Sequence, residues 1–562
     1  MRKSKKVISA LLMSAMVMGL AACGQSAGDG GSTAASDAVS TAQEQSGGTG
    51  ETESGTADTG AADTDSTETA EGSGPVEGGD LVIIDMAEVT SMAWYKVQSF
   101  NDKFQTMITC YETLLRTDES GQIVPWLAKS FESDQEAKTY TITLNEGVKF
   151  HDGSELNAEA ATWCLGEYLA NGVKSQAFFS NIDSFEVTGD YTFVIHLKNW
   201  DATIPYSLAR ECGIMVSKQS GEGKTEEELN DNPVGTGPFM FESMTRDSEK
   251  KFVRFDDYWQ GKPYLDSVTI KIYSDALVSE AAMRNGDAQI LYATDYKLID
   301  SLVADNCHVS LGVPSQIALL CFNCTDEENN PFYDVKVRQA ISYAIDKEAL
   351  AMSIYSNYAV VTNQFAPEGS AFYSDDVVGY DYDPEKAKEL LAEAGYPDGF
   401  STTCIVRNDI MQVNCVTAIQ AMLAEIGVQM EVDVQDSGDF SVNMPKWSTG
   451  MFFHTSSLPM DVTNQMSSMF KQGLSGVVLG LDSLLRPDNL NDEILAAVGA
   501  ANAEEAQAHI RDAQVILIDE ICDLNPVATV YQPMIKSNKL HDDGVNDVEY
   551  AAGTLYKAWL EP

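Results

Sequence analysis

Alternating helical and extended hydrophobic patterns over the long C-terminal part of the chain restrict its fold most strongly. Asp383 caps a predicted helix, Pro384 occupies its first position, an apolar stripe follows at helical spacing, and Gly395 ends it. Residues 414–426 repeat the helical pattern, and residues 428–434 alternate apolar and polar side chains as a strand does. Helices and strands joined by short connections predict an α/β body in which helices cover the sheets.

Earlier segments predict antiparallel strands. In residues 139–144, the apolar side chains Tyr140, Ile142 and Leu144 fall on one face of a strand. Gly189 and Asp190 separate two extended patterns at 185–188 and 191–197. This two-residue glycine turn between strands predicts a β-hairpin.

The N-terminus has the composition of an export signal. Residues 1–6 include one arginine and three lysines, and the uncharged, largely apolar run 7–22 ends just before Cys23. A run of 16 residues is shorter than the roughly 20 that a membrane-spanning helix needs. We therefore expect residues 1–22 to be a signal peptide. Leu20-Ala21-Ala22-Cys23 resembles the lipobox of bacterial lipoproteins, which implies that Cys23 is lipidated; an ordinary signal with an incidental cysteine is the alternative.

Residues 24–79 predict a flexible, acidic tether. They contain eleven acidic residues, no lysine or arginine, and few side chains that could form a core. Such a segment cannot bury enough apolar surface to offset the entropy of ordering. A flexible chain of this length has an end-to-end distance of about 40 Å. The body after residue 79 is long enough for two or three domains.

Charge and cysteine content exclude some classes of function. The formal net charge of −49 argues against nucleic acid and anionic lipid surfaces as partners, because phosphate contacts need clustered lysine and arginine. Nine cysteines remain after Cys23, an odd number at irregular spacing, which is not a disulfide framework. Those that fall within helical or strand patterns, such as Cys164, Cys321 and Cys415, are expected to be small buried hydrophobic residues.

Short catalytic motifs are present but lack the context that their chemistry needs. The G-x-S-x-G pattern at 24–28 lies in the predicted tether rather than between a strand and a helix. Gly223-Lys224-Thr225 resembles the end of a phosphate-binding loop, but Lys218 stands where the first glycine belongs. Cys321 and Cys324 have redox or metal spacing, although a strand would point them to opposite faces. His151-Asp152-Gly153 is explained by a turn, and six histidines without clustering disfavour catalytic zinc. We predict no enzyme activity, no cofactor and no metal site.

Several motifs, taken in order, carry a specific resemblance. They are Tyr111-Glu112-Thr113-Leu114-Leu115, Pro125-Trp126-Leu127-Ala128, Gly147-Val148-Lys149-Phe150-His151-Asp152-Gly153, Asn232-Pro233-Val234-Gly235-Thr236-Gly237-Pro238-Phe239, Tyr258-Trp259-Gln260-Gly261-Lys262-Pro263, Phe322-Asn323, Val337-Arg338-Gln339-Ala340-Ile341 and Tyr382-Asp383-Pro384-Glu385. From about residue 80 to 562, their order and spacing resemble the peptide/nickel class of ABC-transporter solute-binding proteins, known as extracellular solute-binding family 5.

The residues themselves suggest mostly structural roles for these motifs. The glycines of 234–239 suit a tight turn where backbone approaches backbone. Asp334 can cap a helix, and we expect Arg338 on that helix to tie it to a neighbouring segment rather than to contact ligand.

The resemblance implies a two-lobed, periplasmic-binding-protein-like α/β fold with a hinge and an inserted subdomain in the first lobe. By analogy, 80–118, 235–316 and 525–562 form lobe I, 119–234 form its inserted subdomain, and 317–524 form lobe II. The two lobes would close over a solute bound between them.

The resemblance also implies ligand-binding residues. In peptide-binding relatives, a second-lobe segment often carries an acidic residue that pairs with the peptide's amine. The matching residues 447–461 lack the usual Asp- and Gly-rich pattern, and Asp461 is their only acid. Trp447 and His454 in this segment, and Met92 and Trp94 in lobe I, are candidates to line the pocket, with core packing as the alternative. Phe322, Asn323 and Tyr531 would lie beside the two strands that cross between lobes.

These features together predict a monomeric, membrane-anchored extracytoplasmic receptor. Its partners would be a peptide or related small solute and the permease subunits of an ABC importer, with the membrane contacted only through the lipid anchor. A nickel or metal-chelate receptor of the same family is one alternative, with His454 as its only support in the sequence. A peptide-signal sensor without an uptake role is another.

Overall fold

The computed structural model describes residues 74–562 except 86, 98–99, 119–121, 293–298, 304–305, 326–329, 357, 445–446, 448–449, 459–460, 473–482 and 548–552. The chain divides into the units 1–71 and 72–562, and the fold below is that of the second unit. The predicted signal peptide, Cys23 and the tether up to residue 73 lie outside the described residues. Within the described part, each helix is too short or too polar to span a membrane.

The first lobe is built on a mixed sheet, which among the described residues has seven strands in the order β10-β11-β12-β1-β13-β21-β14. Their bounds are Phe239–Thr245, Glu249–Arg254, Ser267–Ile272, Asp80–Asp85, Ile290–Tyr292, Met534–Ser537 and Cys307–Ser310. β1 runs parallel to both β12 and β13, while the outer pairs are antiparallel. Ahead of β1, the Gly78 N–H donates to the Tyr264 carbonyl at 2.8 Å, so the end of the predicted tether is already bonded to this lobe.

An antiparallel sheet in the order β5-β6-β8-β7 follows the first strands of lobe I. Its described strands are Ala128–Asp134, Thr139–Leu144, Thr192–Leu197 and Ile182–Gly189. Tyr140, Ile142 and Leu144 are all buried on one face of β6. β7 and β8 pair across the turn after Gly189, so the predicted alternation and hairpin are both confirmed. The helix α2, Ala158–Asn171, packs on β7 and β8.

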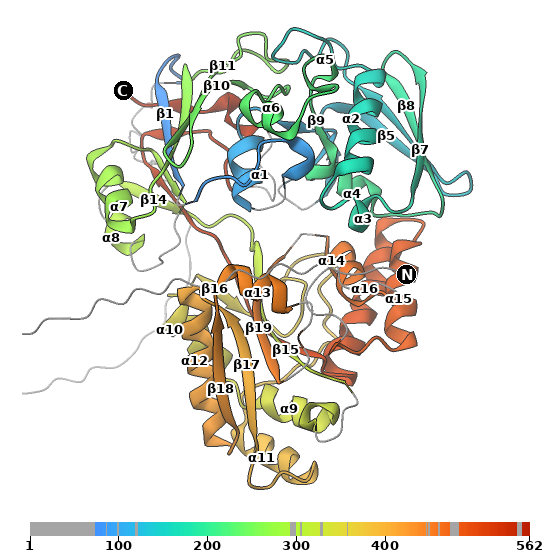
Figure 1. Ribbon diagram of the computed structural model, residues 1–562, viewed down its shortest axis with the longest axis vertical. Coiled ribbons are helices and arrows are strands. Elements are labelled where there is room, and N and C mark those ends of the chain that lie inside the picture. The colour runs from blue at the N-terminus through green and yellow to red at the C-terminus, as the bar shows by residue number, and fades with distance from the viewer. Residues whose placement is uncertain are drawn as a thin grey trace, which may run out of the picture. The chain divides into compact units, whose positions relative to one another are not determined.

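The second lobe has its own mixed sheet, and its described strands follow the order β16-β20-β15-β19-β17-β18. Their bounds are Ala359–Val361, Leu524–Val530, Gln316–Phe322, Met451–Ser457, Ser401–Arg407 and Gln429–Gln435. β17 is parallel to β18 and β19, while β15 is antiparallel to β19 and β20. Figure 1 shows these strands side by side, with the helix α12 beside β17 and β18.

Two short connections join the lobes. The chain leaves the first sheet after β14 and enters the second at β15, through residues 311–315. It returns between β20 and β21 through residues 531–533. The chain therefore passes from one sheet to the other at 311–315 and again at 531–533. The strand β20 pairs within the second sheet, although its residues 525–530 were predicted to belong to lobe I. The exact domain boundaries stay a prediction.

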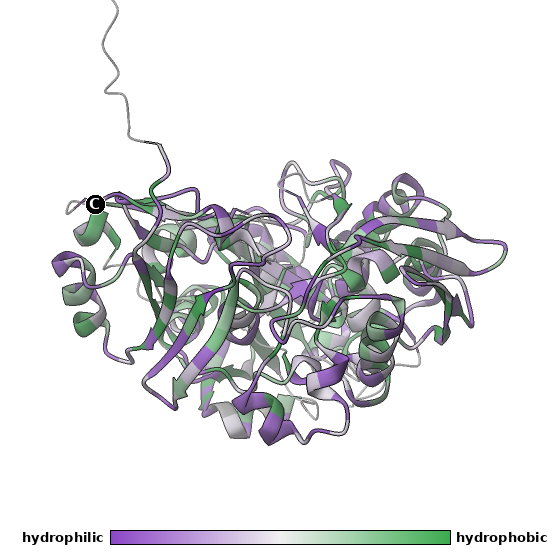
Figure 2. Cartoon of the chain, turned by 90° about the horizontal axis from the view of Figure 1, so that it is seen from above, coloured by the Kyte–Doolittle hydropathy of each residue, from purple (hydrophilic) through white to green (hydrophobic). Residues whose placement is uncertain are grey.

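Helices cover the second sheet, as the sequence pattern predicts. The helix α11, Pro384–Glu393, begins after Asp383, whose carboxylate accepts a hydrogen bond from the Lys386 N–H at 2.9 Å. The helix α12 is Ile410–Glu425 and begins four residues earlier than predicted, because Asp409 provides its N-terminal cap. In Figure 2 the outlying helices carry both hydrophilic and hydrophobic residues, as expected for helices with one face on a core.

The family motifs behave as structural elements. The Gly237 and Phe239 N–H groups donate to the carbonyls of Cys110 and Thr109, each at 3.1 Å. A Cβ atom on Gly235 would overlap the Cys110 carbonyl oxygen, which confirms the predicted close approach of two backbones. Arg338, on the helix α9 (Val335–Tyr343), donates to the carbonyls of Ile521 and Cys522. It ties that helix to a neighbouring segment, as predicted.

All nine cysteines of the described body are buried and unpaired, as expected for small apolar residues. Cys321 lies in β15, and Cys324 follows it with its thiol 3.0 Å from an Asp523 carboxylate oxygen. Burial raises the pKa of both thiols well above the usual range, so both stay protonated at neutral pH. The described residues hold no group of three or more His, Cys, Asp or Glu side chains that could hold a metal ion.

Candidate functional site

A cavity of about 670 Å³ lies where elements distant in sequence come together. Three of its lining residues come from positions 122–206, and the others come from positions 313–531. The lining residues are Gln122, Ile123, Tyr206, Val313, Pro314, Val360, Pro367, Glu368, Gly369, Ser370, Ala371, Phe372, Asp461, Ala503, Gln507, Thr529 and Tyr531. Its size and its mixture of aromatic and polar side chains suit a small organic ligand.

Both interlobe connections contribute to this cavity. Val313 and Pro314 lie in the first connection, and Tyr531 lies in the second. The Tyr531 N–H donates to the Tyr358 carbonyl at 3.1 Å, which continues the pairing of β20 with β16. The cavity therefore includes the segments at which the two lobes could move relative to each other.

Asp461 reaches the cavity from the start of the helix α14, Val462–Phe470. One of its carboxylate oxygens accepts a hydrogen bond from the Thr463 N–H at 2.8 Å, and so caps the helix. The aspartate is positioned by this capping role, and the residue also lines the cavity.

The turn at 367–372 forms another wall and is held by the helix α16, Ala503–Val515. Gln514 is completely buried; its side-chain oxygen accepts from the Ala366 N–H at 2.9 Å, and its nitrogen donates to the Phe372 carbonyl at 2.8 Å. Arg511 donates to the Ala371 carbonyl at 2.8 Å. Side chains of α16 therefore fix both ends of the turn that presents Glu368 and Phe372.

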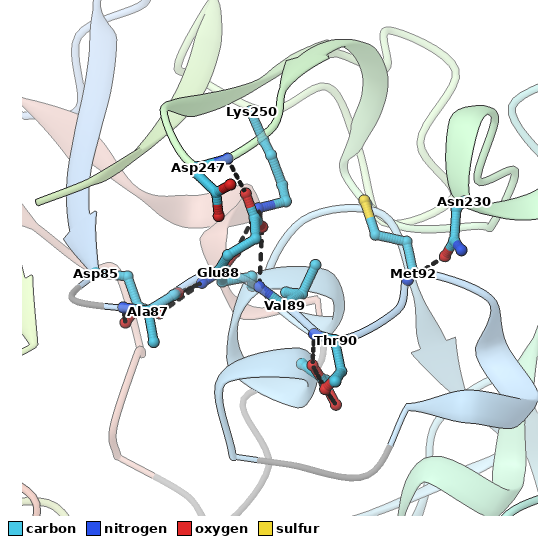
Figure 3. A network of polar contacts seen from close by, with 11 residues as sticks. Asp85, Ala87, Glu88, Val89, Thr90, Met92, Asn230, Asp247 and Lys250 are labelled. Carbon is cyan, nitrogen blue, oxygen red and sulfur yellow. Dashed lines mark hydrogen bonds and ion pairs between the residues drawn. The ribbon is translucent and has the colours of Figure 1, made fainter. Parts of the chain in front are cut away.

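The segment after β1, which contains Met92 and Trp94, is held by a separate polar network (Figure 3). The side-chain oxygen of Asn230 accepts hydrogen bonds from the Ser91 hydroxyl at 2.9 Å, the Met92 N–H at 2.6 Å and the Ala93 N–H at 3.0 Å. Asn230 belongs to the helix α6, Glu226–Asp231. One amide therefore fixes three consecutive residues of this segment.

A buried ion pair anchors the beginning of the same segment. Lys250, which is completely buried, bonds to the Glu88 carboxylate and donates to the Gln105 side chain at 3.0 Å. Gln105 in turn donates to an Asp85 carboxylate oxygen at 2.7 Å. Burial lowers the pKa of Lys250, and its hydrogen bond with Glu88 opposes that change. Figure 3 shows the Lys250 side chain beside Glu88.

The predicted lobe I candidates lie within the core. Met92 and Trp94 are both buried, and the Tyr111 hydroxyl donates to the Met92 carbonyl at 2.7 Å. The Trp94 ring packs against Tyr95 and Trp163. Neither Met92 nor Trp94 is among the lining residues of the 670 Å³ cavity.

Trp447 and His454 belong to an aromatic cluster in lobe II. Trp447 packs against Phe452, and His454 on β19 stacks with Phe440 and Phe452 at centroid distances of 6.2 and 5.8 Å. Burial, reinforced by the charge of Arg407, lowers the pKa of His454 to about 3. The imidazole is therefore neutral at physiological pH.

Phe322 and Asn323 are buried at the end of β15. Phe322 stacks on Phe332 with a centroid distance of 5.7 Å. The Asn323 side-chain oxygen accepts from the Thr325 N–H at 3.1 Å. Of the eight predicted ligand-binding residues, Asp461 and Tyr531 line the cavity, whereas the other six do not.

Comparison with known proteins identifies the family. Residues 122–473 match the model of the bacterial extracellular solute-binding proteins, family 5, in its middle region. The match spans more than half of the chain. The chain belongs to family 5. The predicted family is therefore confirmed.

The glutathione-binding protein GsiB of Salmonella typhimurium is similar to this chain. It is 34% identical to this chain over 332 residues, which are 58% of this chain and 64% of that protein. The matching region therefore spans a little under two thirds of the length of that relative.

Solved structures share the fold. One is the binding protein DppA from Helicobacter pylori in complex with the peptide STSA, with a TM-score of 0.74, 24% identity, and 87% of this chain and 99% of that chain covered. Another is NikZ from Campylobacter jejuni in complex with Ni(L-His), with a TM-score of 0.72, 22% identity, and 85% and 99% coverage. These similarities confirm the two-lobed α/β fold of the family 5 chain.

Reasoning from the sequence missed several cavity residues. Tyr206 lies on the short helix α4, Ile204–Leu208, while Glu368 and Phe372 lie in a turn. The family 5 motifs do not include these positions, and no hydrophobic period marks them. Pro367 and Gly369 do mark a turn in the sequence, but they do not indicate that the turn faces a cavity.

Proposed function

We propose that this chain is an extracytoplasmic solute receptor, anchored to a membrane through Cys23, that captures a peptide or related small solute for an ABC importer. The observation that carries the proposal is the 670 Å³ cavity beside both interlobe connections. Membership of family 5 supports the receptor class. The name and peptide complex of the relatives described above support the choice of peptides and related solutes.

The proposed capture step is closure of the two lobes on the ligand. Residues 311–315 and 531–533 are the backbone segments that would rotate. A ligand can shift the chain toward a closed state only if it binds that state more tightly than the open one. A ligand that contacts Asp461 and Tyr531 together with Tyr206 would do so, because these residues lie on segments that closure would bring nearer to one another.

Calorimetric titration tests the peptide part of the proposal. The full chain is purified, unfolded and refolded to remove any bound ligand, and titrated with a diverse library of short peptides. We expect at least one peptide to bind with a Kd of about 1 μM or tighter, about −8 kcal/mol. Absence of binding across the library would contradict the peptide assignment.

Mass spectrometry of ligand that remains bound after gentle purification separates peptides from metal chelates. We expect a peptide or other small organic solute, without nickel in stoichiometric amount. Stoichiometric nickel would instead support the metal-chelate alternative. His454 packs in the aromatic cluster and is neutral, so its replacement by Phe should leave solute binding unchanged.

The anchor and the transport role need tests in cells. Labelled palmitate should be incorporated into the wild-type chain and not into Cys23→Ala. Deletion of the gene should abolish uptake of the identified solute. Unchanged uptake with loss of a solute-dependent response would favour the sensor alternative. We propose that the receptor acts as a monomer, which light scattering of the purified chain checks.

A further inference from the structure

Three hydrogen bonds join the two lobes at a place remote in sequence from both interlobe connections. The donors are the Ala202 N–H, the Trp200 indole N–H and the Gln135 side-chain amide. Their acceptors are the carbonyls of residues 498, 500 and 499, at 2.8, 2.8 and 3.1 Å respectively. In Figure 1 this contact lies where α4 approaches the helices α15, Asp488–Val498, and α16.

The two sides of this contact belong to different hydrophobic cores. Trp200 packs against the core that includes Ile270 of the first sheet. The helix α15 places Ile494 in the core that includes Leu320 of the second sheet. The hydrogen bonds therefore cross from one lobe to the other, and opening of the lobes about 311–315 and 531–533 would break them.

The acceptors are carbonyls at the C-terminal end of α15. The Gly499 N–H donates to the Leu495 carbonyl at 2.9 Å, and the helix ends at this point. The last carbonyls of a helix lack partners within the helix and must find them elsewhere. The acceptors are therefore fixed in position by α15 itself, and the partners come from the other lobe.

The donors are held in place by the turn around Asp201, which is buried. One of its carboxylate oxygens accepts from the Thr203 N–H at 3.0 Å and hydroxyl at 2.7 Å, and the other accepts from the Asn181 side chain at 2.8 Å. The Trp200 ring stacks on Tyr140 with a centroid distance of 5.0 Å. Because donors and acceptors are fixed within their own lobes, little conformational freedom is lost when they meet.

The contact leads directly into the cavity wall on both sides. Tyr206 lines the cavity from α4, four residues after Ala202. Ala503 and Gln507 line it from α16, which begins three residues after Ala500. A movement that breaks the contact would therefore also separate these parts of the wall.

We infer that this contact is a latch that holds the lobes together whether or not solute is bound, and that Trp200 is a positioning residue that sets how fast solute enters and leaves. The kinetic role rests on the proposed function, whereas the latch itself does not. Solute passes only through the open arrangement, so entry and release both depend on how often the latch opens. A weaker latch should speed both rates by the same factor and leave Kd nearly unchanged.

Hydrogen exchange of the solute-free full chain tests the latch. The chain is unfolded and refolded to remove bound solute, and exchange is followed at the Ala202 amide. We expect this amide to be protected in the wild type and to exchange about fivefold faster in Trp200→Phe, which keeps a ring on Tyr140 but lacks the N–H donor. Gln135→Ala, at an exposed position, should accelerate exchange by about twofold.

Trp559→Phe is the matched control. The Trp559 indole donates to an Asp542 carboxylate oxygen at 2.9 Å, so this variant also loses one indole hydrogen bond, but within the C-terminal segment 540–562. It should leave exchange at Ala202 unchanged. An unprotected Ala202 amide in the wild type, or equal exchange in the wild type, Trp200→Phe and Gln135→Ala, would overturn the latch.

Stopped-flow fluorescence tests the kinetic role, with the peptide STSA and glutathione as probes. Trp200→Phe should raise the association and dissociation rate constants by about fivefold each and change Kd by less than about twofold. A Kd that rises about fivefold at an unchanged association rate would contradict this role, because Trp200 would then stabilise only the solute-bound chain.

The outcomes separate the latch from the proposed function. If exchange at Ala202 depends on Trp200 but neither the probes nor any peptide of the library binds, the latch stands and the proposed function fails. If solutes bind but Trp200→Phe has the exchange and the rates of the wild type, the latch alone is wrong.

Discussion

Glu112 shows how this chain uses a buried carboxylate for structure rather than for ligand binding. It is completely buried, and it accepts hydrogen bonds from the Trp126 indole at 2.9 Å and the Tyr258 hydroxyl at 2.7 Å. Thr236 and Trp259 donate to its other oxygen at 2.8 and 3.1 Å. Burial raises the pKa of Glu112 from 4.5 to about 7, although these hydrogen bonds lower it in part.

Glu112→Gln should change how stability depends on pH. Between pH 4.5 and 7, the folded chain holds a proton on Glu112 that the unfolded chain releases, so the contribution of this carboxyl is greatest below pH 4.5 and is lost as the pH rises through 7. The change is about 1.4 kcal/mol for each unit of pKa. Urea unfolding at pH 5 and 8 should show that the substitution is more costly at pH 5. A cost that grows toward pH 8 would contradict this account.

His454 should remain neutral across the physiological range. Burial lowers its pKa to about 3, so below pH 6.5 the unfolded chain gains a proton that the folded chain does not, and stability falls as the pH falls from 6.5 toward 3. Its NMR signals should stay constant between pH 8 and 5 in the folded chain. His454→Phe should remove this part of the acid sensitivity. A titration midpoint near 6.5 would contradict the lowered pKa of this imidazole.

The eight ligand-binding candidates stay predictions, and the structure places them in different surroundings. Asp461 could be found because it is the only acid in a segment that matches a ligand-binding region of relatives. Trp447 and His454, in the same segment, instead pack in an aromatic cluster. Packing against other aromatic rings separates these cases, and such packing depends on tertiary neighbours that a local pattern does not specify.

Backbone contacts between elements explain the family motifs. The turn at 234–239 approaches the chain at 109–110 so closely that Gly235 and Gly237 have no room for a Cβ atom. Turns, helices and strands could be predicted from the sequence, because the spacing of glycines, the capping residues of helices and the alternation of apolar and polar residues in strands are all local signals. The sequence predicted that α12 begins at residue 414, four residues too late. The helix begins at Ile410 because Asp409 caps it, and its hydrophobic residues extend toward the N-terminus beyond the stripe used for the prediction.

Gly235→Ala should destabilise the fold. The added methyl group would overlap the Cys110 carbonyl oxygen and force one of the two backbone segments to move, at a cost of about 1–3 kcal/mol. Gly166→Ala is the control, because that helical glycine has open space around it and alanine favours helix by about 0.5–1 kcal/mol. Urea unfolding measures both changes. Equal stability of the two variants would contradict the close-approach interpretation.

The turn at 367–372 should become mobile if its support from α16 is removed. Gln514→Leu leaves the Ala366 N–H and the Phe372 carbonyl without their buried partner, which costs about 1–3 kcal/mol. Hydrogen exchange should accelerate at residues 366–372, and solute affinity should fall. Gln429→Leu, at an exposed position on β18, should change neither. Unchanged exchange in Gln514→Leu would show that the turn is held by other contacts.

At the scale of the whole molecule, two mixed sheets and two connections between them define the cavity. The alternating helix and strand patterns predicted the α/β class, and the ordered motifs predicted the two lobes. The cavity wall could be predicted only in part, because it combines Tyr206, Glu368 and Tyr531 from segments far apart in sequence. Neither hydrophobic period nor motif spacing specifies which distant turns meet.

Native mass spectrometry of chains purified gently from their own envelope tests the central claim that this cavity holds the solute. Ala503 is an exposed lining residue at the start of α16, so Ala503→Trp should narrow the cavity without disturbing the core. Ala392→Trp, at an exposed position on α11 outside the cavity, is the control. The wild type and Ala392→Trp should carry the same additional small-solute mass, and a clearly smaller fraction of Ala503→Trp should carry it. Equal occupancy in all three chains would contradict the assignment of the cavity as the binding site.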